Sequence, residues 1–378
     1  MQYASDFIAE MDQLGQSFAA RAASHDEDDS FVAENFAALR ERKIFSAAVP
    51  QDLGGRGVNH ESMCRGLQAM ARHCGSTALA LSMHQHLVQF QKYNHLHGKP
   101  GKALLEKVAA EELVLISTGA GDWLNSNGTA EKVEGGFRVN ARKPFSSGSP
   151  MGNLLMTSAA YRDPAEGWQV LHFPVPFKSE GVRVLDDWKT MGMRGTGSNT
   201  VVLDNVFVPE ASVGIRRPRG TFHPAFMIIS TVATPMVVSA YVGVAEAAAE
   251  LARTQGRKRK PDPGLAYMLG EMENHLTVAQ MALDGMIALA NNLDFEAKVE
   301  IANASLIRKT IAAKAALAAG EKAMEAVGGS GFYRPLGLER RLRDLHGAQF
   351  HPLPEKKQHL FTGRLALGLE AVEVADFT

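Results

Sequence analysis

The sequence predicts an α+β protein with an N-terminal helical domain, a middle antiparallel β-domain and a C-terminal four-helix-type bundle. Hydrophobic residues follow helical spacing within 1–112, change to strand-like alternation within 113–219, and return to long helical segments within 220–378. Strands confined to one section, instead of alternating with helices, favour this arrangement over a parallel βαβ array. No Gly-x-Gly-x-x-Gly string follows a predicted strand, so a Rossmann nucleotide site is not supported.

The helices are predicted from apolar positions three or four residues apart. In the first section such spacing occurs at 31–41, 61–72 and 79–93. A Pro- and Gly-rich loop is predicted between the first two, at 49–57, because no helix could accommodate that string. In the third section the spacing predicts longer helices, which suit a bundle, at 224–253, 264–291 and 296–327.

The middle section is predicted to consist of short strands. Residues 131–140 alternate around Gly135 and Gly136, which predicts a β-hairpin. Further β-rich runs, separated by Gly, Pro and Asp, follow at 154–161, 168–173, 182–185 and 200–208.

The charge and the cysteine content of the chain indicate which partners, metals and compartment to expect. The 40 basic and 41 acidic side chains nearly cancel, so no overall field favours nucleic acid or an anionic membrane. The two cysteines, Cys64 and Cys74, match no zinc spacing, so no metal site is predicted. A chain of 378 residues with two thiols is typical of a reducing compartment, and the N-terminus shows no signal peptide pattern. We therefore expect a cytoplasmic protein.

One segment, 225–245, is long and apolar enough to raise the question of a membrane helix. It contains Ser230, Thr231, Thr234, Pro235 and Ser239, and no basic cluster flanks it closely on both sides. A helix that is apolar nearly all round is also what a bundle core or a subunit interface requires. We therefore expect a buried helix, no membrane partner, and a homo-oligomer (a tetramer or a dimer).

Three strings occur in one order along the chain: VPQDLGGRG at 49–57, DWKTMGMRGT at 187–196, and GGSGF at 328–332 followed by Glu339, Arg343 and Asp344. Together they resemble the motifs of the acyl-CoA dehydrogenase superfamily, which includes a flavin-dependent monooxygenase branch. The resemblance spans nearly the whole chain. It implies the three-domain fold of that family and a flavin between the β-domain and the bundle.

The resemblance also implies candidate residues for the flavin ring. The string 117–122 stands where the family places a ring-binding motif, of which Ser117 and Thr118 remain as candidate donors to the ring edge. In the string FSSG, Phe145 takes the place of an aromatic residue against the ring. Ser147 takes the place of a hydroxyl near the reactive nitrogen, and Ser146 lies between the two. Hydroxyl donors suit the polar edge of a flat apolar ring.

Candidates for the rest of the cofactor lie in the third section. Arg259 matches an Arg that holds the FAD of a neighbouring subunit in the dehydrogenases, although the Phe expected three residues later is Asp262. From the residues alone, Gly328 and Gly329 indicate a helix C-cap. By resemblance they would instead allow close approach of the ribityl-phosphate. The resemblance implies FAD, with FMN as the alternative.

Three residues are candidates for the catalytic group of the site. A dehydrogenase needs a carboxylate beside the substrate α-carbon, but the family position, nine residues after Arg343, is Pro352. Glu355 can take this role if 352–354 is an insertion. His351 is the alternative, as in the monooxygenase branch. His84 is the third candidate; His86 follows it, but histidines two residues apart on a helix do not face one pocket.

Three functions therefore stay open. The first is oxidation of a CoA thioester at Cα–Cβ, with hydride transfer to flavin and a separate electron acceptor. The second is a two-component monooxygenase that uses O2 and flavin reduced by a flavin reductase, which the FSSG string favours. The third is a flavin-binding homologue without turnover.

Overall fold

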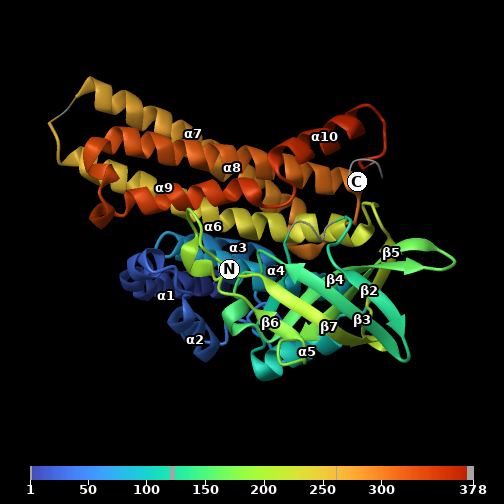
Figure 1. The fold of residues 1–378 in the computed structure, drawn as a ribbon. Helices are drawn as coiled ribbons and strands as arrows, with labels where there is room; N and C mark the ends of the chain where they lie inside the picture. The colour runs from blue at the N-terminus through green and yellow to red at the C-terminus, as the bar shows by residue number, and fades with distance from the viewer. Residues whose placement is uncertain (1, 120–123, 261, 373–378) are drawn as a thin grey trace.

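The computed structural model of the chain describes residues 2–119, 124–260 and 262–372. Its helices and strands follow the predicted order: helices, then a sheet, then a second set of helices. Figure 1 shows the long C-terminal helices as one layer, with the N-terminal helices and the sheet beside each other beneath it. This order confirms the predicted α+β fold.

The N-terminal helices are α1 (Gln2–Glu27), α2 (Ala33–Glu41), α3 (His60–Ala71), α4 (Gly75–Leu96) and α5 (Lys102–Glu111). The start of α3 is capped by Asn59, whose side chain accepts a hydrogen bond from the Ser62 N–H at 2.8 Å. The predicted interruption at 49–57 is confirmed, because it contains only the short 3-10 helix Gln51–Leu53 before Gly54, which has φ of 89°.

The middle section contains β1 (Leu115–Ser117), β2 (Thr129–Val133), β3 (Gly136–Lys143), β4 (Leu154–Asp163), β5 (Gly167–Pro176), β6 (Val182–Val184), β7 (Val201–Pro209) and β8 (Ile215–Pro218). The sheet order is β6-β7-β3-β2-β4-β5-β8, with β1 beside β4. The hairpin predicted around Gly135 is confirmed, since Val133 pairs with Gly136. Most pairings are antiparallel, as predicted, whereas β4 is parallel to both β1 and β2. Other strands separate β4 from these two along the chain, so no tight turn forces an antiparallel pairing.

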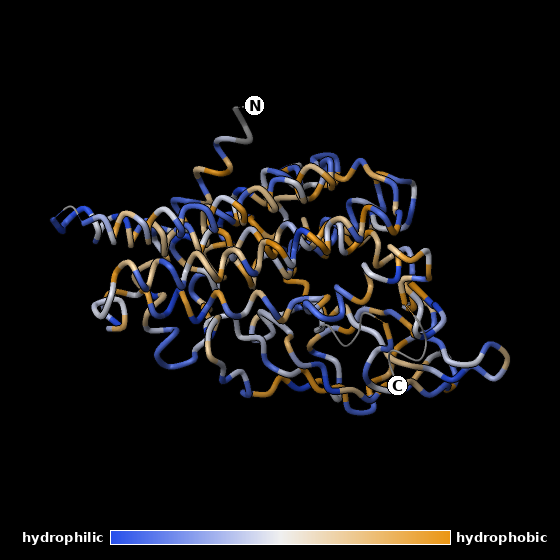
Figure 2. The backbone as a smooth tube through the Cα atoms, turned by 90° about the horizontal axis from the view of Figure 1, so that it is seen from above, coloured by the Kyte–Doolittle hydropathy of each residue, from blue (hydrophilic) through white to orange (hydrophobic). Residues whose placement is uncertain are grey.

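The third section forms the bundle from α6 (Pro224–Arg257), α7 (Pro263–Ala290), α8 (Val299–Val327) and α9 (Leu338–His346), followed by α10 (Glu355–Ala366). The three long helices predicted for this section are confirmed to within a few residues. Figure 2 shows hydrophobic and hydrophilic positions alternating along the helices, as expected for amphipathic helices that pack side by side.

Helix α6 is the apolar helix that raised the membrane question. Among the described residues it alone is long and apolar enough to span a bilayer, and 78% of its most apolar window is buried inside the protein. It packs against α3 and α4 on one side and α8 on the other. Its hydroxyls are satisfied within the helix: Ser239 donates to the Pro235 carbonyl at 2.8 Å, and Thr234 to the Ser230 carbonyl at 2.5 Å. These contacts favour a central bundle helix.

Candidate functional site

A cavity of about 370 Å³ lies where the N-terminal helices, the sheet and the bundle meet. Its volume falls in the range typical of small-molecule sites, about 300–1,000 Å³. The β-domain and its loops contribute one wall, and α4, α6, α8 and the segment after α9 contribute the other. Its lining includes Met83, His86, Ser117, Thr118, Phe145, Ser147, Trp188, Met191, Met193, Ser198, Ile229, Val237, Tyr241, Lys309, Arg343, His346, Gly347, Phe350 and His351.

A chain of hydroxyls lies in the β-domain wall. Ser147 Oγ is 2.7 Å from Ser198 Oγ, which is 2.7 Å from Thr196 Oγ1. The Thr196 hydroxyl donates to the Met193 carbonyl at 2.9 Å. Since each hydroxyl has one proton, this contact directs the chain from Ser147 through Ser198 to Thr196. Ser147 then presents oxygen lone pairs, rather than a proton, to the cavity.

Ser117 ends strand β1 at the same wall. Its Oγ is buried and has no hydrogen-bond partner among the described residues. A buried hydroxyl without a partner costs free energy unless a ligand or water satisfies it. Ser117 therefore supplies a donor that this part of the chain leaves for a bound molecule. Thr118 lines the cavity next to it, whereas residues 120–122 of the predicted ring-binding string lie outside the described residues.

Phe145 has a backbone conformation that aromatic residues rarely adopt. Its φ is 59°, in the left-handed region, and 51% of its surface is exposed toward the cavity and solvent. Its ring meets that of Trp188 edge to face, with 5.5 Å between the centroids. Strained conformations of this kind concentrate at ligand-binding sites. Phe145 and Trp188 thus provide aromatic surface that faces the cavity and is not fully packed in the hydrophobic core.

The bundle wall contains a hydrogen-bonded pair, Tyr241 of α6 and His351. The Tyr241 hydroxyl is 2.7 Å from His351 Nε2. Gly347 leaves room for this hydroxyl, since a Cβ at Gly347 would lie 2.8 Å from it. Burial lowers the pKa of His351 to about 3 and raises the pKa of Tyr241, so both groups are neutral near pH 7.

His86 and Lys309 line the same wall. The His86 ring contacts the Ser82 carbonyl through Nδ1 at 3.3 Å, and burial lowers its pKa to about 4. Lys309 Nζ donates to the Leu353 carbonyl at 2.9 Å, and burial lowers the pKa of Lys309 to about 8. None of the described residues that line the cavity is Asp or Glu. The wall therefore combines neutral proton-carrying groups with one ammonium group.

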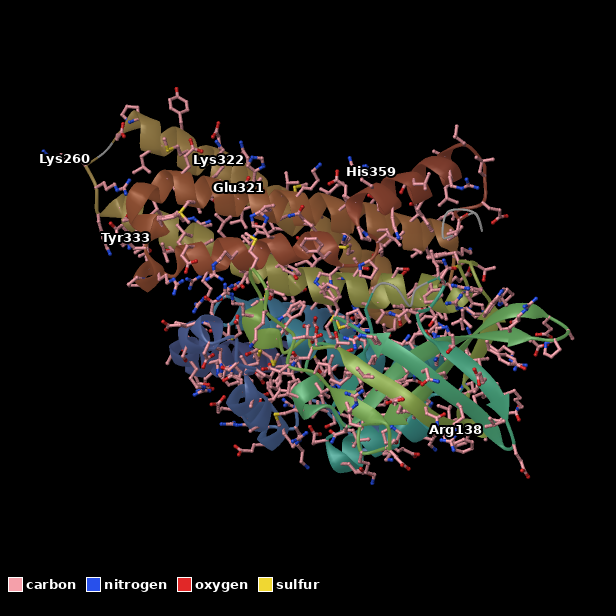
Figure 3. All side chains as sticks on the ribbon, viewed as in Figure 1. Arg138, Lys260, Glu321, Lys322, Tyr333 and His359 are labelled. Atoms are coloured by element: carbon pink, nitrogen blue, oxygen red, sulfur yellow. The ribbon has the colours of Figure 1, made fainter. Side chains whose placement is uncertain are left out.

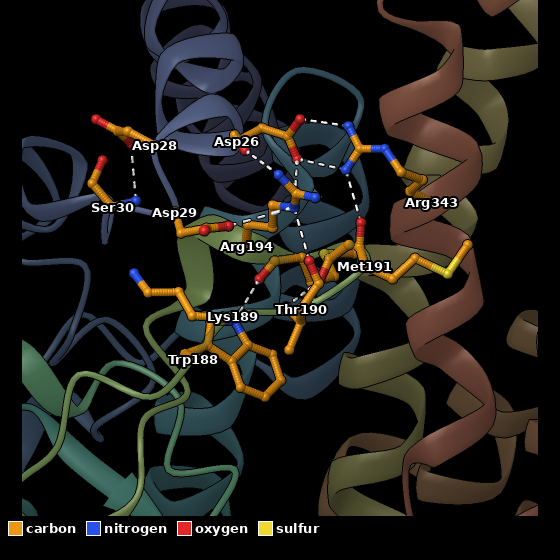
Figure 4. A network of polar contacts seen from close by, with 12 residues as sticks. Asp26, Asp28, Asp29, Ser30, Trp188, Lys189, Thr190, Met191, Arg194 and Arg343 are labelled. Carbon is orange, nitrogen blue, oxygen red and sulfur yellow. Dashed lines mark hydrogen bonds and ion pairs between the residues drawn. The ribbon is translucent and has the colours of Figure 1, made fainter.

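The loop that carries Trp188 and Met193 is fixed by charged side chains (Figure 4). Arg343 of α9 donates to Asp26 at the end of α1 at 2.9 Å, and to the Met191 carbonyl at 2.8 Å. Asp344 accepts the Met193 N–H at 2.5 Å. These bonds attach one edge of the cavity to both the bundle and the N-terminal domain.

Six of the residues predicted for the site do not line the cavity: Glu355, His84, Ser146, Arg259, Gly328 and Gly329. Glu355 begins α10, forms an ion pair with Lys314 at 3.1 Å and does not line the cavity, which disfavours it as the candidate base. His84 is buried on the other side of α4, where Nε2 contacts the Phe45 carbonyl and Nδ1 accepts the Leu115 N–H, both at 2.9 Å. Both of its ring nitrogens are therefore occupied. Ser146 is buried and donates to the Lys143 carbonyl at 2.9 Å.

The residues predicted to hold the rest of an FAD lie at the end of the bundle away from the sheet, where Figure 3 labels Lys260 and Tyr333. Arg259 donates to the carbonyls of Ala326 and Val327, which end α8. Gly328 follows directly with φ of 73°, as the C-cap interpretation predicts. Neither Gly328 nor Gly329 lines the cavity. Within the chain, Arg259 thus completes a helix end.

Sequence reasoning missed Tyr241 and Lys309. Lys309 carried a usable signal, because it interrupts a stripe of small and apolar residues at helical spacing that also contains Ala302, Leu306, Ala313 and Ala316. A lysine on such a stripe must be buried. Tyr241 lies in a helix that is apolar nearly all round, so nothing in its spacing distinguished it.

Known protein families match all three sections of the chain. Residues 7–112 match the N-terminal domain of acyl-CoA dehydrogenases, residues 118–206 the middle domain, and residues 232–355 the C-terminal domain. The chain belongs to the acyl-CoA dehydrogenase superfamily. The resemblance inferred from the three strings is therefore confirmed.

Similar proteins within this superfamily include oxygenases. An amino sugar nitrososynthase from Streptomyces peucetius is 26% identical, over 88% of this chain and 86% of that protein. The oxygenase subunit of a flavin-dependent monooxygenase from Rhodococcus jostii is 26% identical, over 94% of this chain and 97% of its own length. The solved structure of KijD3 with FMN and a dTDP-linked amino keto sugar has a TM-score of 0.88 and 25% identity, covering 98% of this chain and 95% of KijD3.

Proposed function

We propose that this member of the superfamily is the oxygenase of a two-component monooxygenase, which uses reduced FMN and O2 to oxygenate a small molecule. The observation that carries the proposal is the composition of the cavity wall. Abstraction of a proton beside a thioester needs a base, for which the dehydrogenase hypothesis expects a carboxylate, and the described lining residues include none. The wall instead contains Tyr241, His351 and His86, which are neutral near pH 7.

The β-domain wall suits a flavin ring. Phe145 and Trp188 provide aromatic surface, Ser117 Oγ lacks a partner among the described residues, and Ser147 presents an acceptor oxygen to the cavity. These residues would hold the ring at its face and its polar edge. When bound, reduced FMN would supply the two electrons that allow O2 to place one oxygen atom in the substrate and release the other as water.

His351 and Tyr241 would manage protons at the opposite wall. A neutral imidazole has one N–H donor and one acceptor nitrogen, and a neutral phenol can donate or accept. The 2.7 Å contact between Nε2 and the phenol oxygen therefore holds one proton that either ring can carry. A pair of this kind can relay a proton within the cavity, since one ring can accept a proton as the other donates one, and the pair then keeps no net charge. Met83 and Phe350 add apolar surface to the same cavity.

FMN fits this chain better than FAD. The Arg assigned to the FAD of a neighbouring subunit is engaged at the end of α8 by two carbonyls, and the similar protein KijD3 was solved with FMN. A flavin reductase is the partner that this chemistry requires. We also infer an oligomer, because Tyr267, Met281, Phe332 and Tyr333 of the bundle are each at least 67% exposed.

The proposal is tested by offering the protein both chemistries. The first reaction contains FMN reduced by a separate reductase, isotopically labelled O2, and a panel of small aromatic, amine and sulfur compounds. Incorporation of the label into a product is the expected result. The second reaction contains oxidised FMN and a panel of CoA thioesters without oxygen. Bleaching of the flavin by a thioester, with no labelled product in the first reaction, would replace the proposal with the dehydrogenase function.

A further inference from the structure

We propose that Lys309 forms an anion subsite in the cavity and that the molecule bound there is a small, mainly apolar carboxylic acid. The inference rests on the proposed function only in calling this molecule the substrate. Its physical basis is the placement of one buried ammonium group in the wall opposite the residues assigned to the flavin.

Lys309 lies in the middle of α8, with 3% of its surface exposed. Among the described residues its Nζ donates one hydrogen bond, to the Leu353 carbonyl at 2.9 Å. An ammonium group has three N–H donors, so two remain for other partners. In the described part of the chain no carboxylate lies within 4.0 Å of Nζ. The negative charge of Glu355 raises the pKa of Lys309 from farther away, and Glu355 is itself paired with Lys314.

A buried cation without a counter-ion is unfavourable, because it has lost its water without gaining an opposite charge. Burial lowers the pKa of Lys309 to about 8, which leaves the group charged at pH 7. Beside Lys309, this wall contains His351, His86 and Tyr241, which are neutral at pH 7. His346 and Arg343 of α9 also line the cavity. The positive charge of Lys309 is thus available to a ligand.

The two remaining N–H donors match the two oxygens of a carboxylate. A phosphate group has more negative charge and more acceptor oxygens than one ammonium group can match. The described lining offers one other cation among its Lys and Arg residues, Arg343, which is already bound to Asp26 and Glu339. The surrounding wall is apolar, with Ile229, Val237 and Phe350. A compact carboxylic acid with an apolar body fits both features.

The test compares a carboxylate with its neutral analogue. Benzoate and benzamide are titrated separately into the FMN-loaded protein by calorimetry at pH 7. We expect benzoate to bind at least about tenfold more tightly, which corresponds to about 1.4 kcal/mol. The preference should fall above pH 8, where Lys309 loses its proton. Equal affinity for the two compounds, or no binding of benzoate, would overturn the proposal.

Three variants separate charge from packing. Lys309→Gln keeps a donor for the Leu353 carbonyl without the charge, and it should abolish the preference for benzoate. Lys309→Arg restores a positive charge and should restore part of it. Lys314→Gln is the matched control on the same helix, because Lys314 is 63% exposed and pairs with Glu355 outside the cavity. A preference that survives in Lys309→Gln would place the anion elsewhere.

The affinity for benzoate is measured without turnover, so the outcome of the titrations is separate from that of the oxygenation assay. If benzoate binds through Lys309 while no labelled product forms in the oxygenation assay, the subsite stands and the monooxygenase function fails. If product forms while the preference for benzoate is absent, the monooxygenase function stands and the subsite fails.

Discussion

Tyr241→Phe removes one oxygen atom from the proposed proton-carrying pair and leaves the packing of the ring in place. Tyr241 is almost fully buried, and its hydroxyl is the only partner shown for His351 Nε2 in the described chain. A buried group that loses its partner costs about 1–3 kcal/mol, against about 0.5–1.5 kcal/mol for an ordinary net hydrogen bond. We therefore expect the free energy of unfolding to fall by about 1–3 kcal/mol.

The same change should uncouple the reaction, because His351 loses the partner that orients its ring. General acid–base catalysis contributes about 10²–10⁴-fold, so we expect at least about tenfold more hydrogen peroxide per oxygenated product. Urea unfolding gives the stability, a peroxide assay gives the coupling, and NMR of the imidazole nitrogens reports the His351 tautomer.

Tyr93→Phe is the matched control. Tyr93 is equally buried, and its hydroxyl donates to the Phe295 carbonyl at 2.9 Å, away from the cavity. It should lose stability without any change in coupling. Equal coupling in the two variants, with the His351 tautomer unchanged in Tyr241→Phe, would refute the assignment of this pair to proton transfer.

Three further predictions follow from the same geometry. Glu355→Gln should leave flavin reduction, oxygenation and stability nearly unchanged, because Glu355 pairs with the exposed Lys314 outside the cavity; a hundredfold loss of rate would return the base to this position. Ser147→Ala should weaken FMN binding by about 0.5–1.5 kcal/mol and shift the flavin spectrum, whereas an unchanged spectrum and affinity would assign the hydroxyl chain to folding alone. The free energy of unfolding should fall as the pH decreases from about 6.5 to 4, because burial lowers the pKa of five histidines to about 3 or 4, and the unfolded chain therefore binds more protons in this range; the five are His60, His84, His86, His172 and His351. Each histidine contributes about 1.4 kcal/mol per pH unit. A urea midpoint that stays constant from pH 7 to pH 5 would contradict this prediction.

The sequence alone was sufficient for features that depend on neighbours along the chain. The hairpin at Gly135 and the C-cap at Gly328 follow from local backbone preferences. The long bundle helices follow from apolar residues three and four positions apart. The ordered strings that revealed the superfamily are also properties of the chain itself, as the matches over 7–112, 118–206 and 232–355 show.

The tertiary structure decided which side chains reach the cavity. His84 and His86 are two positions apart on α4, so they project in different directions. Only the packing of α4 against β1 shows that His84 binds two backbone groups while His86 lines the cavity. Spacing could not choose between His351 and Glu355 either, because the outcome depends on where α10 begins and on its contact with Lys314 of α8.

Tyr241, Lys309 and His351 illustrate the physical reason. They lie on α6, on α8 and in the segment before α10, and they meet only after the helices have packed. Hydrophobic periodicity indicates which face of a helix is buried, but it does not indicate which other helix or strand packs against that face. The sequence therefore determined the elements and the family of this protein, and the packing between distant helices determined its candidate site.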